Sequence, residues 1–205
     1  MLGVDQPPFA NALTISDFAD QAVILPLTVG TGLLLAISGW RRGAFAWMVA
    51  VGSALGLILL LKLRFFACDH IAEAAVGGNP SGHTAAAAAV YGGLAGIMTT
   101  AMRNGARFAL PCAVAVGTSI AVIIGQSRLT LDKHSVVEVM VGGAIGVAGA
   151  ASVVGLGGRP SPPIPVWRIV AAGFIVVGLL HGMRLSAEDT IRLIAADLLP
   201  KLQCI

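Results

Sequence analysis

Two short polar segments interrupt an otherwise apolar chain, and both carry residue types that can bind or transfer a phosphate group. In the first, residues 79–84 read Asn-Pro-Ser-Gly-His-Thr and precede an alanine-rich run. A turn that leads into a helix leaves backbone N–H groups free, and these together with the helix dipole favour an anion. Ser81 adds a hydroxyl donor, Gly82 permits close backbone approach, and His83 lies at the edge of the apolar run. Taken alone, a helix cap with a histidine at the membrane boundary explains these residues equally well.

The second segment, residues 127–138, combines a histidine, an acid and an arginine. His134 and Glu138 are four residues apart and therefore share one face of a helix. A carboxylate on one imidazole nitrogen fixes the tautomer and makes the other nitrogen a better nucleophile. Arg128 can form bidentate hydrogen bonds with phosphate oxygens. A surface ion pair is the simpler explanation, but Glu138 lies a turn inside an apolar helix, where an acid needs a partner.

The elements that position these segments are predicted to be membrane helices. Hydrophobic residues make up 57% of the 205 residues and charged residues 11%, against roughly 25% charged in a soluble domain, and the composition therefore excludes a soluble enzyme. Apolar runs long enough to cross a bilayer fall near 21–39, 44–62, 83–101, 108–126, 136–156 and 167–184. The sequence predicts an all-α polytopic bundle with about six transmembrane helices in a single domain over residues 1–205.

Both ends of the chain are predicted to lie at the membrane surface. Residues 1–20 carry three aspartates and no basic start, which excludes a signal peptide and favours an interfacial segment. Residues 185–205 place apolar residues at three- and four-residue steps after a serine cap at Ser186. We expect this C-terminal helix to lie flat on the interface, and packing against its own bundle or a second subunit is the alternative. His181 is expected at a helix contact or membrane end of the sixth span.

Charge is distributed unevenly between the two faces of the predicted bundle. An even number of spans puts both termini on one side, together with all ten Asp and Glu residues. The loops 40–43, 102–107 and 157–166 contain arginines and no acid. These short loops are predicted to be cytoplasmic. The polar segments and both termini would then face the periplasm from the cell (inner) membrane.

Together the two segments resemble motifs of the type 2 phosphatidic acid phosphatase superfamily of membrane phosphatases. That family carries Lys-x6-Arg-Pro, Pro-Ser-Gly-His, and Ser-Arg-x5-His-x3-Asp. Here Pro80-Ser81-Gly82-His83 is intact, and Ser127-Arg128 is followed by His134 and Glu138 at the family spacing, with Glu in place of Asp. The resemblance covers roughly residues 62–150.

The first motif departs from the family pattern. Lys62 matches its lysine, but Asp69 and His70 stand where Arg-Pro is expected. Arg64 is a candidate substitute for the absent arginine, and His70 is a secondary candidate for touching substrate. Asp69 would repel a phosphate, so we expect it to point away from the site or to pair with Arg64 or Lys133.

The resemblance implies a metal-independent reaction without a cofactor. His134 would attack phosphorus to form a phosphohistidine, Glu138 would support His134, and His83 would serve as acid and then base. Phosphate-binding roles would fall to Lys62, Ser81, Gly82 and Arg128.

The substrate implied is a lipid phosphate or diphosphate, with undecaprenyl diphosphate, phosphatidylglycerol phosphate, phosphatidic acid and a lipid A phosphate as candidates. A phosphotransferase on the same fold and a non-catalytic lipid-binding protein with a degraded site are the alternatives. Membrane lipids are the expected surroundings, and nucleic acid is not an expected partner because the basic residues form no runs. The sequence leaves the oligomeric state open.

Overall fold

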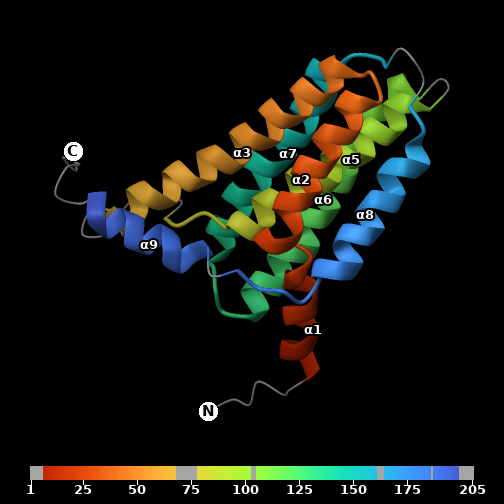
Figure 1. Cartoon of the computed structure of the whole chain (residues 1–205). Helices are drawn as coiled ribbons and strands as arrows, with labels where there is room; N and C mark the ends of the chain where they lie inside the picture. Colours follow the sequence, from red (N-terminus) through yellow and green to blue (C-terminus); the bar gives the residue numbers. More distant parts are fainter. Residues whose placement is uncertain (1–6, 68–77, 103–104, 161–163, 186, 199–205) are drawn as a thin grey trace.

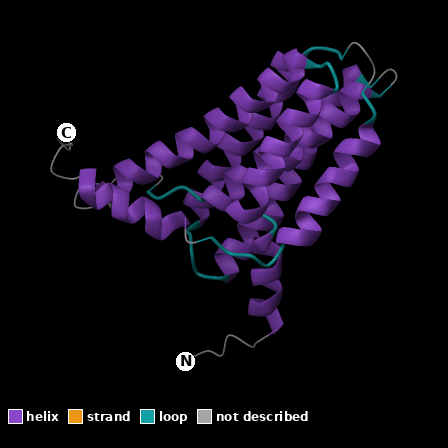
Figure 2. Ribbon diagram, viewed as in Figure 1, coloured by secondary structure: helices purple, strands orange, loops and turns teal. Residues whose placement is uncertain are grey.

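The chain folds into a bundle of α-helices (Figures 1 and 2). The computed structural model describes residues 7–67, 78–102, 105–160, 164–185 and 187–198, and no strand occurs in these ranges. Their helices are α1 (Pro7–Asp17), α2 (Gln21–Ile37), α3 (Arg41–Ala67), α5 (Gly82–Ala101), α6 (Ala106–Thr130), α7 (Val136–Gly157), α8 (Val166–Leu180) and α9 (Ala187–Leu198). The predicted all-α architecture is confirmed.

Five apolar segments are long enough to cross a membrane, which identifies a multi-pass membrane protein. They are Pro8–Ile37, Arg41–Ala67, Gly82–Ala101, Ala106–Thr130 and Val136–Gly157. The sixth predicted span corresponds to α8, which has only 15 residues. At 1.5 Å rise per residue it reaches about 22 Å, short of a hydrocarbon core of about 30 Å. His181 therefore lies just beyond the end of α8 rather than inside a span.

Three helices begin with side-chain caps, because the free N–H groups of a first turn need acceptors. Asp20 accepts a hydrogen bond from the backbone of Ala22 at the start of α2. Ser81 caps α5, and Ser135 with Glu138 forms a capping box on α7. These three helix starts lie at the same end of the bundle as the last turns of α3 and α6 (Figure 1).

Helix α5 is the centre of the bundle and packs against α2, α3, α6 and α7. Its residues 85–90 are completely buried, which explains why this weakly hydrophobic run is rich in alanine. Gly146 of α7 packs directly on α5, since an added Cβ would lie 2.4 Å from the Ala85 carbonyl oxygen. The helix contacts at Gly92, Gly96 and Gly142 are also tight, whereas a Cβ on Gly52 or Gly56 would meet no atom within 4 Å.

The C-terminal part of the chain returns to the end of the bundle where α2 and α5 begin. Arg184 forms a two-pronged ion pair with Asp17, at 2.7 and 3.0 Å. His181 Nε2 lies 3.1 Å from the carbonyl oxygen of Thr14. Helix α9 then packs against α3 (Figure 1), so the structure favours the alternative that the C-terminal helix docks on its own bundle.

Candidate active site

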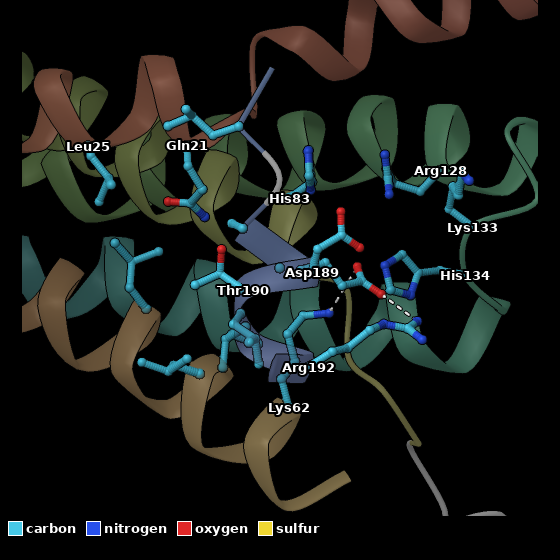
Figure 3. Close-up of a pocket in the computed structure, with 18 of the residues that line it drawn as sticks. Gln21, Leu25, Lys62, His83, Arg128, Lys133, His134, Asp189, Thr190 and Arg192 are labelled. Carbon is cyan, nitrogen blue, oxygen red and sulfur yellow. Dashed lines mark hydrogen bonds and ion pairs between the residues drawn. The ribbon is translucent and has the colours of Figure 1, made fainter. Parts of the chain in front are cut away.

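A pocket of about 980 Å³ opens where α2 and α5 begin and where α3 and α6 end (Figure 3). Part of its wall is polar, formed by Lys62, His83, Arg128, Asp132, Lys133, His134, Glu188, Asp189, Thr190 and Arg192. Another part is apolar and includes Leu25, Leu55, Gly56, Ile58 and Leu59. Helices from distant parts of the sequence thus bring two histidines and several cations to one cavity.

His134 is held by Glu138 at the start of α7. Its Nδ1 lies 3.2 Å from Glu138 Oε2. The same carboxylate accepts hydrogen bonds from the backbone N–H groups of Ser135 and Asn79, both at 2.9 Å. Since Nδ1 is engaged, Nε2 remains as the nitrogen available to a substrate.

The electrostatics of the pocket keep His134 neutral. Its side chain is only 2% exposed. Burial, reinforced by the positive charges of Lys62 and Arg128, lowers the pKa of His134 from 6.5 to about 4 despite the opposing effect of Glu138. A neutral imidazole retains the lone pair that a nucleophile requires.

Lys62 is buried in the last turns of α3 and faces the same pocket. Its ammonium donates a 2.7 Å hydrogen bond to Asn79 Oδ1. Because Asn79 also donates its backbone N–H to Glu138, one asparagine connects the lysine to the carboxylate that holds His134. This connection fixes a positive charge near the imidazole.

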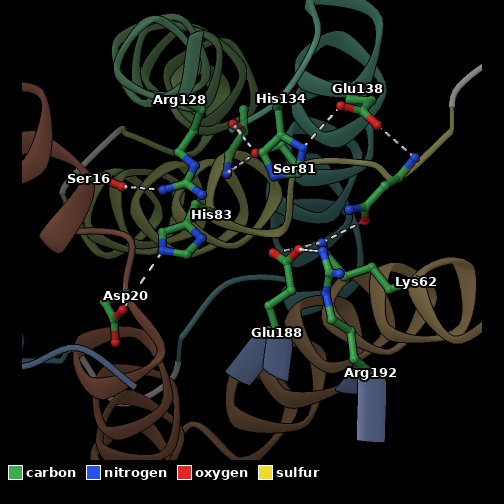
Figure 4. A network of polar contacts seen from close by, with 12 residues as sticks. Ser16, Asp20, Lys62, Ser81, His83, Arg128, His134, Glu138, Glu188 and Arg192 are labelled. Atoms are coloured by element: carbon green, nitrogen blue, oxygen red, sulfur yellow. Dashed lines mark hydrogen bonds and ion pairs between the residues drawn. The ribbon is translucent and has the colours of Figure 1, made fainter. Parts of the chain in front are cut away.

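His83 and Arg128 lie on another side of the pocket (Figure 4). His83 Nε2 is 3.8 Å from Asp20 Oδ2, in the same turn that caps α2. Arg128 donates from Nη1 to Ser16 Oγ at 3.0 Å. Its Nε is buried and has no hydrogen-bond partner among the described residues, although buried polar groups normally have one.

Two of the predicted phosphate-binding residues differ in their accessibility. Gly82 lines the pocket, and a Cβ there would lie 3.4 Å from Lys62 Cε. Ser81 is fully buried, and its hydroxyl is engaged with the hydroxyl of Thr84 at 2.9 Å while capping α5. It is not among the residues that line the pocket, and its role as a phosphate donor stays a prediction.

Of the candidates offered for the missing part of the first motif, the structure describes only Arg64, and it does not bring that residue into the site. Arg64 is exposed and does not line the pocket. Asp69 and His70 lie outside the described residues, so their expected positions stay predictions. Over the described ranges, no group of three His, Cys, Asp or Glu side chains is arranged to hold a metal ion.

Sequence reasoning missed residues that contact or support the site. They are Ser16 and Asp20 near α1 and α2, Asn79, and Glu188 with Arg192 on α9. An Asp directly before the first apolar run is a signal for a cap. The i,i+4 spacing of Glu188 and Arg192 indicates a helical ion pair, but neither signal identifies the pocket.

The sequence is similar to one protein family and to a relative from Klebsiella pneumoniae. The family model of the PAP2 superfamily matches residues 64–159, which contain both polar segments. An "Uncharacterized 22.5 kDa protein in cps region" of Klebsiella pneumoniae is 32% identical over 177 residues, covering 83% of this chain and 83% of the relative. No solved structure matches. On this similarity and on the two motifs that line or support the pocket, the chain belongs to the PAP2 superfamily.

Proposed function

We propose that this protein is a membrane lipid phosphatase that hydrolyses a phosphate monoester or diphosphate through a phosphohistidine on His134. The observation that carries the proposal is the pairing of His134 with Glu138 beside Lys62 and Arg128 in one pocket. A neutral histidine held by a carboxylate and flanked by cations has the parts needed for nucleophilic attack on a phosphate. Family membership supports phosphatase chemistry.

The reaction has two displacement steps. His134 Nε2 attacks phosphorus, the bond from phosphorus to the leaving oxygen breaks, and His83 gives its proton to that oxygen. His83 then accepts a proton from a water molecule that attacks the phosphohistidine. The phosphorus–nitrogen bond breaks, and inorganic phosphate leaves.

The other residues stabilise charge or position the nucleophile. Lys62 and Arg128 offset the negative charge that develops on the phosphate oxygens. Glu138 stabilises the imidazole as it becomes positive, and Asp20 lies where it can orient His83. The backbone of Gly82 lines the cavity and leaves room for a phosphate oxygen.

A lipid substrate is supported by the apolar part of the pocket. Leu25 on α2 and Leu55, Gly56 and Leu59 on α3 line the same cavity as the catalytic histidines. A charged headgroup would occupy the polar wall, while hydrocarbon chains would remain between the helices. A charged headgroup joined to hydrocarbon chains is common to the four candidate substrates: undecaprenyl diphosphate, phosphatidylglycerol phosphate, phosphatidic acid and a lipid A phosphate.

The experiment is release of inorganic phosphate from these four lipids by the purified chain in detergent. We expect release by the wild type, a loss of at least about a thousandfold in His134→Ala, and no change in Arg107→Gln, which alters an exposed arginine away from the pocket. Activity is expected to persist in EDTA. Transfer of phosphate to an added alcohol would identify a phosphotransferase, and no turnover with any lipid would favour a non-catalytic lipid-binding protein.

A further inference from the structure

Helix α9 forms part of the wall of the catalytic pocket. Residues 187–192, its first six, line the same cavity as His134 and Lys62 (Figure 3). The helix packs on α3, the helix that carries Lys62. The C-terminal helix therefore contributes side chains to the place where a phosphate would bind, although it lies outside the segment matched by the family model.

Glu188 places one carboxylate between two cations in this pocket (Figure 4). Its Oε2 lies 3.7 Å from Lys62 Nζ, and its Oε1 lies 3.2 Å from Arg192 Nη2. Burial opposes ionisation, but Lys62 and the hydrogen bond from Arg192 outweigh it and lower the pKa of Glu188. An anionic oxygen pair thus occupies a position between Lys62 and Arg192 where phosphate oxygens would find the same two donors.

We propose that Arg192 is a phosphate-binding residue of this site and that Glu188 is its resting partner, displaced by the incoming phosphate. The proposal rests on the proposed phosphatase function. Arg192 would join Lys62 on one side of the phosphate, opposite the side of the pocket where Arg128 lies. Glu188 would keep both cations in place while the site is empty.

The contacts of Arg192 suit an exchangeable ligand. Its side chain is 59% exposed, and an exposed i,i+4 ion pair with Glu188 is weak. The guanidinium carbon lies 4.6 Å from the centre of the Phe66 ring, which positions the group without occupying its N–H donors. A phosphate carries more charge than a carboxylate and matches the guanidinium fork, so it is expected to replace Glu188.

The test measures binding of inorganic phosphate to the full-length protein in detergent by isothermal titration calorimetry, together with kcat and KM on a lipid that the wild type hydrolyses. Arg192→Gln is expected to weaken phosphate binding about tenfold and to raise KM more than it lowers kcat. Glu188→Gln removes the competing carboxylate and is expected to tighten phosphate binding several-fold. Arg192→Lys should be intermediate, and Arg107→Gln should match the wild type.

The two substitutions are expected to change the affinity for phosphate in opposite directions, and this distinguishes ligand binding from a structural role. Both substitutions break the same ion pair, so a pair that only fixes α9 would give changes in the same direction, and this would overturn the inference. Unchanged phosphate binding in Arg192→Gln, with normal lipid hydrolysis by the wild type, would overturn it and leave the phosphatase intact. A wild type that neither binds nor releases phosphate would overturn both. If Arg192→Gln does not fold, the comparison of Arg192→Lys with Glu188→Gln decides by the same criterion.

Discussion

At the residue scale, the site is built from histidines that each lie beside a carboxylate. Glu138 contacts His134 and is itself held by two backbone N–H groups. Asp20 lies beside His83 while it also accepts hydrogen bonds from the backbone of Ala22 and Leu185. In both cases the carboxylate that contacts the imidazole also caps the start of a helix. The same hydrogen bonds that form these helix ends therefore position the acids of the site.

Substitution of Glu138 tests this support. Glu138→Gln keeps the size of the side chain but cannot stabilise a positive imidazole, so we expect kcat to fall by about two orders of magnitude. Glu138→Asp retains the carboxylate and should keep partial activity. The measurement is the steady-state rate of phosphate release from a lipid that the wild type hydrolyses. Equal rates for the wild type and Glu138→Gln would show that the acid only caps α7.

The depressed pKa of His134 predicts a pH-dependent loss of stability. Because the pKa is about 4 in the folded protein and 6.5 in the unfolded chain, the unfolded chain binds more protons between these values. The free energy of unfolding is therefore highest above pH 6.5. It falls by about 3 kcal/mol as the pH drops from 6.5 to 4, because protons bind to His134 of the unfolded chain first.

The check compares thermal unfolding of the wild type and His134→Ala in detergent at pH 7.5 and pH 4.5. The wild type should lose more of its Tm between the two pH values than the variant does. Parallel losses in the two proteins would mean that His134 is as easily protonated in the folded state as in the unfolded chain.

At the element scale, close contact between helices depends on glycines of α7. A Cβ on Gly146 would lie 2.4 Å from the Ala85 carbonyl oxygen and 2.7 Å from Ala88 Cβ, whereas a Cβ on Gly155 would meet nothing within 4 Å. Gly146→Ala is therefore expected to destabilise the bundle by about 1–3 kcal/mol. The matched control Gly155→Ala should be neutral or slightly stabilising, since Ala favours helix. The measurement is Tm in detergent, and similar Tm values for the two variants would contradict the packing.

Sequence patterns predicted the long helices because an apolar segment long enough to cross a membrane must satisfy its backbone hydrogen bonds internally, and a helix does so. The motif spacings named His83, Arg128, His134 and Glu138, and these residues line the pocket or contact a residue that does. Their catalytic and phosphate-binding roles stay predictions. The motif spacings did not locate Asp20 or Arg192, whose positions depend on how distant helices pack. The end of α8 was also missed: the predicted span ran to residue 184, whereas the helix ends at Leu180 and Gly182 takes a left-handed backbone with φ 86°.

At the whole-molecule scale, the two ends of the bundle differ in chemistry. The described acids gather at the end that holds the pocket. Five of them line it or contact its histidines: Asp20, Asp132, Glu138, Glu188 and Asp189. The opposite end carries arginines. One of them, Arg42, donates a hydrogen bond from Nε to the backbone carbonyl oxygen of Leu156 at 2.9 Å. The exterior between them is apolar, with Phe45, Leu60 and Phe174 at 64–76% exposure. This separation of charge between the two ends is the basis for predicting which end faces the cytoplasm.

We expect the pocket end to face away from the cytoplasm, because short loops rich in arginine are retained on the cytoplasmic side. Single cysteines introduced into a variant without its native cysteines test this: Lys133→Cys at the pocket end and Met102→Cys at the opposite end, both exposed positions. In intact cells a membrane-impermeant maleimide should label Lys133→Cys, and Met102→Cys should react only after the membrane is permeabilised. Labelling of Met102→Cys alone in intact cells would reverse the orientation and would place the phosphatase pocket, with its lipid headgroup, on the cytoplasmic face.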